Sequence, residues 1–294
     1  MNVGLIDVDG HGWPNLALMK CSSWHKERGD MVEFWNGLKH YDRVYVSRVF
    51  DDTYSHDVQY PINADEIIRG GTGYGLENRL PDEIEHIYPD YSLYGIQNTA
   101  YGFLTRGCPR ACEFCIVSKK EGRASRKVAD LKEFWRGQRT IKLLDPNLLA
   151  SPDAGELIDA LAKSDAAIDF TQGLDARLLT AENIRQLNGV KVKMLHFAWD
   201  FMRESDAVLA GLARYNKYGA IKDERKKRVY VLTNFDTTHD EDLYRIYTLR
   251  TMGYDPYVMI YNKPSAPRNT KRLQRYVNNK FIWRACERFE DYKG

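Results

Sequence analysis

The sequence predicts an α/β protein. Short apolar runs of strand length recur along the 294 residues, and segments with helical periodicity separate them. This alternation is typical of parallel sheets whose strands are joined by helices. A content of 43% hydrophobic and 29% charged residues is that of a globular domain, and the length suits one large or two modest domains. We expect three segments: residues 1–95, 96–262 and 263–294.

Residues 1–95 are expected to form a small α/β domain of the flavodoxin or Rossmann kind. Its expected elements are strands at 3–8, 31–35, 43–47 and 66–71 and a helix at 15–24. A glycine-rich segment at 70–75 follows the last of these strands, at a sheet edge where ligands of open α/β sheets bind. Its glycine spacing matches neither a Walker nor a dinucleotide fingerprint, so it predicts no phosphate site.

Residues 96–262 are expected to contain six strand–helix units. The strands are expected at 102–107, 139–144, 167–172, 192–199, 228–233 and 257–261. Helices are expected from 151, at 180–187, at 205–215 and at 242–252, the first with Ser151 as N-cap and Pro152 as its first residue. Six units are too few to close an eight-fold barrel.

Three cysteines fall within eight residues: Cys108, Cys112 and Cys115, spaced C-x3-C-x2-C. The chain has two others, Cys21 and Cys286. Thiolates at this density are ligands for a soft metal centre, and iron–sulfur clusters are their commonest use. Three ligands leave one iron of a [4Fe-4S] cluster without a protein thiolate. Such an open position lets a cluster bind a small molecule.

A zinc site and a disulfide are two other uses that three such cysteines can have. A zinc site would need a fourth Cys or His at suitable spacing, and the nearest histidines are His86 and His196. A disulfide within the triplet is disfavoured because the chain shows neither a signal peptide nor the cysteine pattern of a secreted protein.

The cysteine segment resembles the signature of the radical S-adenosylmethionine (radical SAM) enzymes, which has an aromatic residue, here Phe114, before the last cysteine. The resemblance implies an open, partial (βα)6 barrel over residues 96–262. It also implies that the three cysteines hold a [4Fe-4S] cluster whose fourth iron is chelated by SAM. A donor such as flavodoxin or ferredoxin would supply the electron that cleaves SAM to methionine and a 5′-deoxyadenosyl radical. That radical would act on an unidentified substrate.

Polar residues at the expected strand ends are the candidate SAM contacts, because reactive groups of parallel barrels gather there. They are Asp145, Asn147, Gln172, Asp175, Arg177 and Asp200, with Trp199, Asn234 and Asp236 at neighbouring ends. Arg177 suits the SAM carboxylate. Asp145 or Asn147 suits the amino group, although the family's Gly-Gly-Glu is absent there, and Asp200 or Gln172 suits the ribose. Alternatively, Asp145 and Asp175 cap helices and Arg177 pairs with Asp175.

Residues 1–95 resemble a shortened version of the cobalamin-binding domain found in many radical SAM enzymes. Asp9 and His11 match part of the D-x-H-x-x-G motif that ligates cobalt, but Pro14 stands where the glycine belongs. A strand-end loop, with Asp9 capping the next helix or its histidine neighbour, is the preferred interpretation. A cobalamin-dependent methyltransferase is therefore an alternative function.

The segment from Lys263 to Arg284 carries seven Lys or Arg residues and no acidic residue. With interleaved aromatic residues it is compatible with a tRNA- or DNA-modifying enzyme. A solvated helix packed on the barrel explains the same pattern and is preferred. No apolar run approaches the length of a membrane span, so we expect a cytoplasmic protein without a membrane partner.

Overall fold

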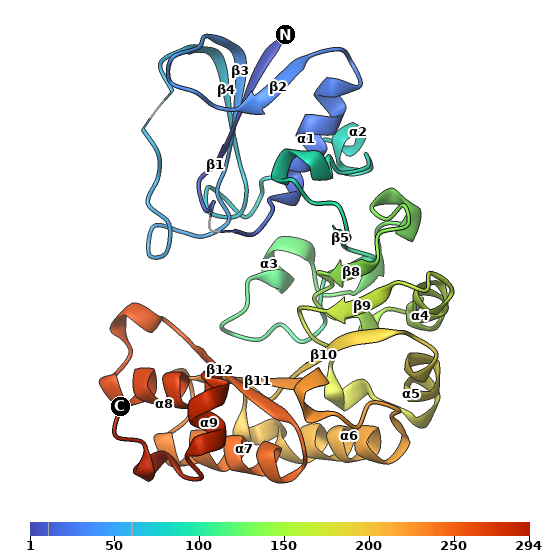
Figure 1. Cartoon of the computed structure of the whole chain (residues 1–294), viewed down its shortest axis with the longest axis vertical. Helices are drawn as coiled ribbons and strands as arrows, with labels where there is room; N and C mark the ends of the chain where they lie inside the picture. Colours follow the sequence, from blue (N-terminus) through green and yellow to red (C-terminus); the bar gives the residue numbers. More distant parts are fainter. Residues whose placement is uncertain (11, 60) are drawn as a thin grey trace. The chain divides into compact units, whose positions relative to one another are not determined.

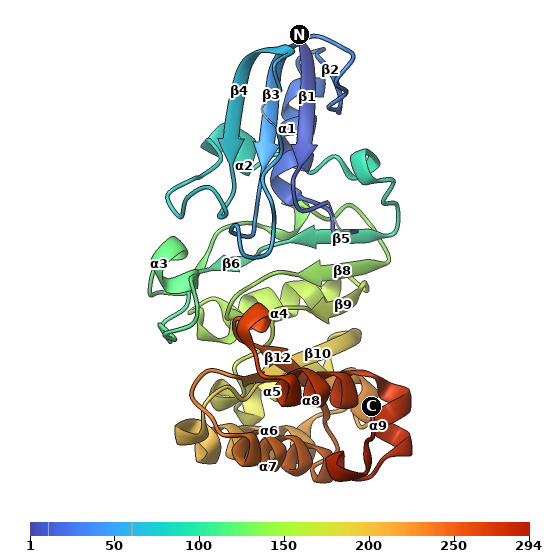
Figure 2. The same ribbon diagram turned by 90° about the vertical axis from the view of Figure 1, so that its left-hand side faces the viewer.

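The computed structural model describes residues 1–10, 12–59 and 61–294 and shows an α/β chain with parallel sheets of four and six strands (Figures 1 and 2). The predicted α/β class is therefore confirmed. The chain divides into two compact units. The first comprises residues 1–102 and 129–138, and the second comprises residues 103–128 and 139–294.

The first unit is built on a sheet with the strand order β2-β1-β3-β4, parallel throughout. Its elements are β1 (Asn2–Asp7), α1 (Leu16–Lys26), β2 (Met31–Phe34), β3 (Tyr41–Ser47), β4 (Ala64–Gly70), α2 (Asp82–Glu85) and β5 (Thr99–Gly102). The expected strands and helix are all present, with ends moved by a few residues. Asn15 starts α1 because its side chain accepts a hydrogen bond from the Leu18 amide.

Asp9 holds a neighbouring loop rather than the start of a helix. Its carboxylate accepts hydrogen bonds from the amides of Val49 and Phe50 and from the Ser55 hydroxyl. The expectation that Asp9 caps the next helix is therefore wrong, because Asn15 occupies that place. His11, the other half of the cobalt-binding match, lies outside the described residues.

The glycine-rich segment after β4 is closely packed by the first unit itself. A β-carbon on Gly71 would lie 2.2 Å from the Arg48 carbonyl oxygen, and one on Gly73 would lie 2.2 Å from that of Phe50. The Arg48 guanidinium also donates to the Gly73 carbonyl over 2.6 Å. These glycines are thus explained by close approach of the chain to itself, without a phosphate or cofactor.

The second unit contains most of the six-stranded sheet, whose order is β12-β11-β10-β9-β8-β5. Its elements are β6 (Thr105–Arg106), α3 (Val117–Glu121), β7 (Arg126–Lys127), β8 (Thr140–Leu143), α4 (Ala154–Lys163), β9 (Ala167–Phe170), α5 (Ala181–Asn188), β10 (Val192–Ala198), α6 (Ser205–Tyr218), β11 (Lys227–Thr233), α7 (His239–Thr251), β12 (Asp255–Ile260), α8 (Arg268–Asn278) and α9 (Lys280–Ala285). Helices α4 to α7 connect successive parallel strands and lie on one side of the sheet (Figures 1 and 2).

The side chains facing these helices form the core of the second unit. Ile141, Ile168, Phe197, Val229 and Val258 come from five neighbouring strands and are fully buried. The Phe197 ring lies 5.7 Å from that of Tyr215 on α6. Burial of alternate strand residues against helices accounts for the period-two pattern in the sequence.

Capping residues fix where two of these helices begin. Thr180 and Thr238 both form capping boxes at the N-termini of α5 and α7, pairing with Asn183 and Glu241 respectively. β9 ends at Phe170 and β11 at Thr233, so these caps also set where the strand-end loops before α5 and α7 stop.

Three expected boundaries were wrong. The strand expected at 102–107 is broken at Phe103 and Leu104, so β5 ends at Gly102 and the short β6 pairs antiparallel with β7. Helix α4 begins at Ala154 with Asp153 as N-cap, two residues later than Ser151 and Pro152 suggested. The single C-terminal helix is divided at Asn279, whose side chain accepts hydrogen bonds from the amides of Phe281 and Ile282.

Within residues 1–10, 12–59 and 61–294, no helix is both long and apolar enough to cross a membrane.

Candidate metal centre

The three cysteines lie on one loop between β6 and α3, within the second unit. Gly107 enters the loop with φ of 88°, and a β-carbon there would lie 2.2 Å from the Ala124 carbonyl oxygen. The Cys108 amide donates to the Gly122 carbonyl over 3.1 Å, and the Cys115 amide donates to the Cys112 carbonyl over 3.0 Å. Ala111, between the first two cysteines, has φ of 50°. The backbone thus turns sharply so that the three thiols belong to one compact segment.

Asp145 anchors the strand that leads into the loop. It is buried just after β8, and its carboxylate accepts hydrogen bonds from the Leu104 and Thr105 amides over 3.2 and 2.5 Å and from the Thr105 hydroxyl over 2.7 Å. Burial raises the pKa of Asp145 to about 6, against the effect of these donors. The carboxylate is thus directed at the start of the loop.

Glu121 anchors the other end of the loop. Its carboxylate accepts a hydrogen bond from the Gly107 amide over 3.2 Å and forms an ion pair with Arg106 over 2.7 Å. Glu121 is the last residue of α3, so this contact joins the helix that leaves the loop to the strand that enters it.

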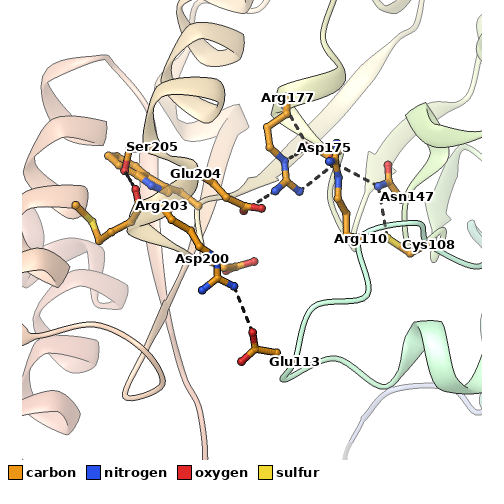
Figure 3. Close-up of polar contacts among 12 residues, drawn as sticks. Cys108, Arg110, Glu113, Asn147, Asp175, Arg177, Asp200, Arg203, Glu204 and Ser205 are labelled. Atoms are coloured by element: carbon orange, nitrogen blue, oxygen red, sulfur yellow. Dashed lines mark hydrogen bonds and ion pairs between the residues drawn. The ribbon is translucent and has the colours of Figure 1, made fainter. Parts of the chain in front are cut away.

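Asp175 is the centre of a charged network beside the cysteines (Figure 3). The Nε atoms of Arg110 and Arg177 donate to its carboxylate over 2.6 and 2.7 Å, and the Asn147 amide group lies 3.4 Å away. Burial raises the pKa of Asp175, but the pairs with Arg177 and Arg110 outweigh it and keep that pKa below its usual range. Asn147 also donates to the Cys108 sulfur over 3.6 Å, while its Oδ1 is buried without a hydrogen-bond partner in the structure as described.

Two further carboxylates lie close to this network. Glu204, just before α6, forms an ion pair with Nη1 of Arg177 (Figure 3). Asp200, after β10, is partly buried, and desolvation raises its pKa to about 6 although Arg245 and Arg177 oppose the shift. Arg177 is therefore shared between Asp175 and Glu204, and Asp200 lies in a poorly solvated position near it.

The thiols share this electrostatic environment. Burial raises the pKa of Cys112 to about 11, and the negative charges of Asp200, Cys115, Cys108 and Glu204 add to the effect. Burial also raises the pKa of Cys115, again with contributions from Cys108 and Asp200. Cys108 is thus close enough to Cys112 and Cys115 to raise their pKa values further.

Phe114 joins the cysteine loop to the segments that follow β10 and β11. Its ring lies 5.7 Å from that of Phe201, after β10, and 5.6 Å from that of Phe235, after β11. Phe235 in turn contacts Tyr261, after β12, with ring centroids 4.9 Å apart. Arg203 strengthens the same junction by pairing with Glu113 and Asp236 over 3.5 and 3.1 Å.

The donor set fits a soft metal centre that lacks one protein ligand. Three thiols on one loop are the ligands that iron–sulfur clusters use, and neither a fourth thiol nor an imidazole contacts them among the described residues. As the side chains stand, no three His, Cys, Asp or Glu groups in this part of the chain are close enough to hold an ion. The thiols would therefore have to turn toward a shared centre and lose their protons as it binds.

The structure brings most of the candidate site residues together. The cysteine loop is surrounded by Asn147, Asp175, Arg177 and Asp200, and it also contains Phe114. Asp145 accepts hydrogen bonds from the strand that leads into the loop. Gln172, by contrast, is exposed and makes no hydrogen bond to another described residue. Arg177 does pair with Asp175, as one interpretation of the sequence held.

Sequence reasoning missed several members of this group: Arg110, Glu121, Glu204, Phe201 and Phe235. Arg110 lies inside the cysteine motif, where its charge was a signal that could have been used. The others lie in loops and at helix ends, and no spacing rule connects them with the cysteines.

No family model matches this chain, and none of the curated proteins searched matches it.

Proposed function

We propose that the protein is a radical SAM enzyme, in which Cys108, Cys112 and Cys115 hold a [4Fe-4S] cluster. The observation that carries the proposal is the C-x3-C-x2-C loop, partly buried beside charged strand ends of a parallel sheet that has helices on one side. With one iron free of protein ligands, the cluster would supply the electron transfer that cleaves SAM. We further propose that the six-stranded sheet is an open, partial (βα)6 barrel.

The residues around the loop suit the polar groups of SAM. Arg110 and Arg177 both pair with Asp175 through their guanidinium groups. The carboxylate of SAM would take the place of Asp175 on one of these two groups. Asp200 and Glu204 supply acceptors for the ammonium group and for ribose hydroxyls. Asn147 retains an unsatisfied Oδ1 beside Cys108. The Asp145 carboxylate is occupied by the amides of Leu104 and Thr105, so its role is to position the loop.

An electron donor is part of the proposal, because the cluster must be reduced before each SAM cleavage. A flavodoxin or ferredoxin fits that need, and an oxygen-sensitive cluster is best protected in the cytoplasm. Bound cobalamin forms no part of the proposed function. The Asp9 carboxylate accepts hydrogen bonds from the neighbouring loop, and the glycines after β4 pack against the chain.

The test is anaerobic reconstitution of the full chain with iron and sulfide. The wild-type protein should take up about four irons and, with dithionite and SAM, release 5′-deoxyadenosine. Cys112→Ser should lose both properties. Cys286→Ser is the matched control, since Cys286 is also a free cysteine of the second unit but lies outside the loop. Deoxyadenosine formation by Cys112→Ser would overturn the proposal.

A second candidate, an enzyme that modifies nucleic acid, is favoured by the exposed side of α8. Arg268, Lys271 and Arg275 are exposed and spaced three and four residues apart, so they form one stripe along the helix. Leu273, Tyr276 and Val277 pack the opposite side. Arg272 is not part of the stripe, because it donates to the carbonyls of Tyr292 and Gly294.

Binding of a short RNA duplex and of a tRNA should be measured at two salt concentrations. If the stripe contacts phosphates, charge reversal at Arg268, Lys271 and Arg275 should lower affinity and reduce the salt dependence, by about 0.9 in the log–log slope for each contact. Equal binding by the wild type and the reversed variant would exclude this surface.

A further inference from the structure

The sheet of the second unit has one face that is unusually polar for parallel strands. Sheets of this kind are normally apolar on both faces because helices cover both. Besides the apolar Met194, Leu232 and Met259, seven of the residues that alternate with the buried core positions are ionisable or aromatic. They are Lys142, Asp169, His196, Arg228, Tyr230, Asp255 and Tyr257.

The strand register and one side-chain contact join five of these residues in a stepped row across the sheet. The row is offset by two residues between β9 and β10, because Asp169 is paired with Met194 rather than with His196. Lys142 on β8 is paired with Asp169 on β9, and Arg228 on β11 is paired with Asp255 on β12. His196 on β10 is paired with Arg228 and lies 3.6 Å from the Asp169 carboxylate. Charges therefore alternate along the row, with an imidazole between its two charged pairs, and Lys280 adds a further positive charge through its ion pair with Asp255 over 2.5 Å.

Part of this row lacks hydrogen-bond partners. The Asp169 side chain is only 14% exposed, its Oδ1 is fully buried, and it makes no hydrogen bond to another residue that the structure describes. The His196 Nδ1 atom lies 3.2 Å from the Phe170 carbonyl oxygen, to which it donates its proton when the ring is neutral. Nε2 is then the unprotonated ring nitrogen and can accept a hydrogen bond. A buried carboxylate without a donor is costly, so the arrangement indicates a ligand that donates to it.

Aromatic rings border the same row toward the strand ends. The Tyr230 ring stacks on His196 with an interplanar angle of 11° and contacts Tyr257 with centroids 5.9 Å apart. Tyr230 is held in place because its hydroxyl donates to the Thr171 carbonyl over 2.9 Å. The Arg228 guanidinium uses Nε and Nη2 on Asp255, and Nη1 makes no hydrogen bond to a described residue.

We propose that this polar face is a binding site for a guanine-type base. Such a base carries two adjacent N–H donors, which suit the Asp169 carboxylate and the His196 acceptor, and a ring carbonyl, which suits Nη1 of Arg228. Its flat ring suits contact with Tyr230 and Tyr257. Strands β9 and β11 are separated by about 10 Å, because β10 lies between them. A base bound to Asp169 on β9 spans part of this distance, and the long Arg228 side chain on β11 spans the rest.

A peptide guanidinium would offer similar donors to Asp169. Arg228 and Lys142 on either side of Asp169 disfavour a second cation there, whereas a neutral base meets no such repulsion. The two sources are separated experimentally below. The idea that the base is part of a substrate of the cysteine site rests on the proposed function. Binding of the base to this face does not depend on the proposed function.

The test is calorimetric titration of the full-length, metal-free protein with guanosine, inosine and adenosine. Guanosine should bind most tightly, and inosine, which lacks the exocyclic amino group, about tenfold more weakly. Asp169→Asn should weaken guanosine binding about tenfold or more and abolish its advantage over inosine. Asp159→Asn on the exposed side of α4 is the matched control and should change nothing.

A second variant keeps the proposal testable if Asp169→Asn fails to fold. Tyr257→Leu leaves the charged row intact and should weaken all three nucleosides equally while guanosine keeps its advantage. Equal affinity for the three nucleosides, unchanged affinity in folded Asp169→Asn, no binding at all, or tighter binding of arginine methyl ester would each overturn the proposal. Repeating the titration after iron reconstitution separates this site from the cysteine centre, because failure to take up iron with guanosine binding intact removes only the proposed function.

Discussion

Arg245 connects the ends of two strands beside the cysteine loop, and its removal gives a quantitative prediction. Its side chain is fully buried on α7 and pairs with Asp242 over 2.5 Å. The same guanidinium donates to the carbonyls of Trp199 and Asp200 after β10 and to that of Leu232 on β11, over 2.7, 3.1 and 2.7 Å. Arg245→Met keeps much of the volume and removes all of these donors.

The expected loss of stability follows from what the variant leaves behind. Breaking a buried ion pair by removing one partner costs about 3–5 kcal/mol, because the remaining charge stays buried. Three strand-end carbonyls also lose a donor, which places the cost near the top of that range, at about 5 kcal/mol. For a domain of this size the melting temperature should fall by roughly 10–20 °C.

Urea unfolding of the metal-free protein, followed by circular dichroism, measures this change. Arg250→Met is the matched control on the same helix, because Arg250 is partly exposed and donates to the carbonyls of Glu287 and Trp283 without a buried ion-pair partner among the described residues, so it should cost about 1–2 kcal/mol. Adding Asp242→Leu to Arg245→Met should recover much of the stability, since the stranded carboxylate is then absent. A loss below about 1.5 kcal/mol for Arg245→Met would refute the reasoning.

Three further changes test the loop and its surroundings. Gly107→Ala should abolish iron uptake, because its β-carbon would meet the Ala124 carbonyl at 2.2 Å, whereas Gly137→Ala, also at positive φ but in open space, should retain it; equal iron contents would contradict this. Arg177→Ala should weaken SAM binding about ten- to a hundred-fold in equilibrium dialysis with iron content unchanged, and unaltered affinity in the folded variant would remove Arg177 from the site. Asp145 has a pKa raised to about 6 in the folded chain, so it binds its proton more tightly there than when unfolded, and its contribution to stability declines as pH rises. The stability advantage of the wild type over Asp145→Asn should thus fall by about 2.5 kcal/mol between pH 4 and pH 7 in urea titrations, and a constant difference would show that the carboxyl is not so perturbed.

The period of the apolar residues was enough to predict the sheets. Strands such as Val192–Ala198 and Lys227–Thr233 alternate between core and polar positions, and that alternation is visible in the sequence. The break at Phe103 and Leu104 was not visible, because the two residues are as apolar as the strand residues around them. It arises from Asp145, which takes the Leu104 and Thr105 amides away from strand pairing.

The candidate site divides in the same way. The cysteines and the residues that follow each strand were found because topology brings parallel strand ends together. Glu204 was missed because it reaches Arg177 only through the turn that precedes α6, and Gln172 was included although the chain turns it outward. Such outcomes depend on loop conformation, which neither periodicity nor composition encodes.

The cysteine loop belongs to a segment that is tethered at both ends. Residues 103–128 lie between two stretches assigned to the other compact unit, 1–102 and 129–138, so the backbone passes from one unit to the other three times. A fragment beginning at residue 139 would therefore lack the cysteine motif altogether, and one beginning at 103 would keep the ten residues 129–138 without the rest of their unit. Neither unit can be expressed alone by a single truncation. A split-protein or circular-permutation design would have to rejoin residue 128 to residue 139 through a new linker.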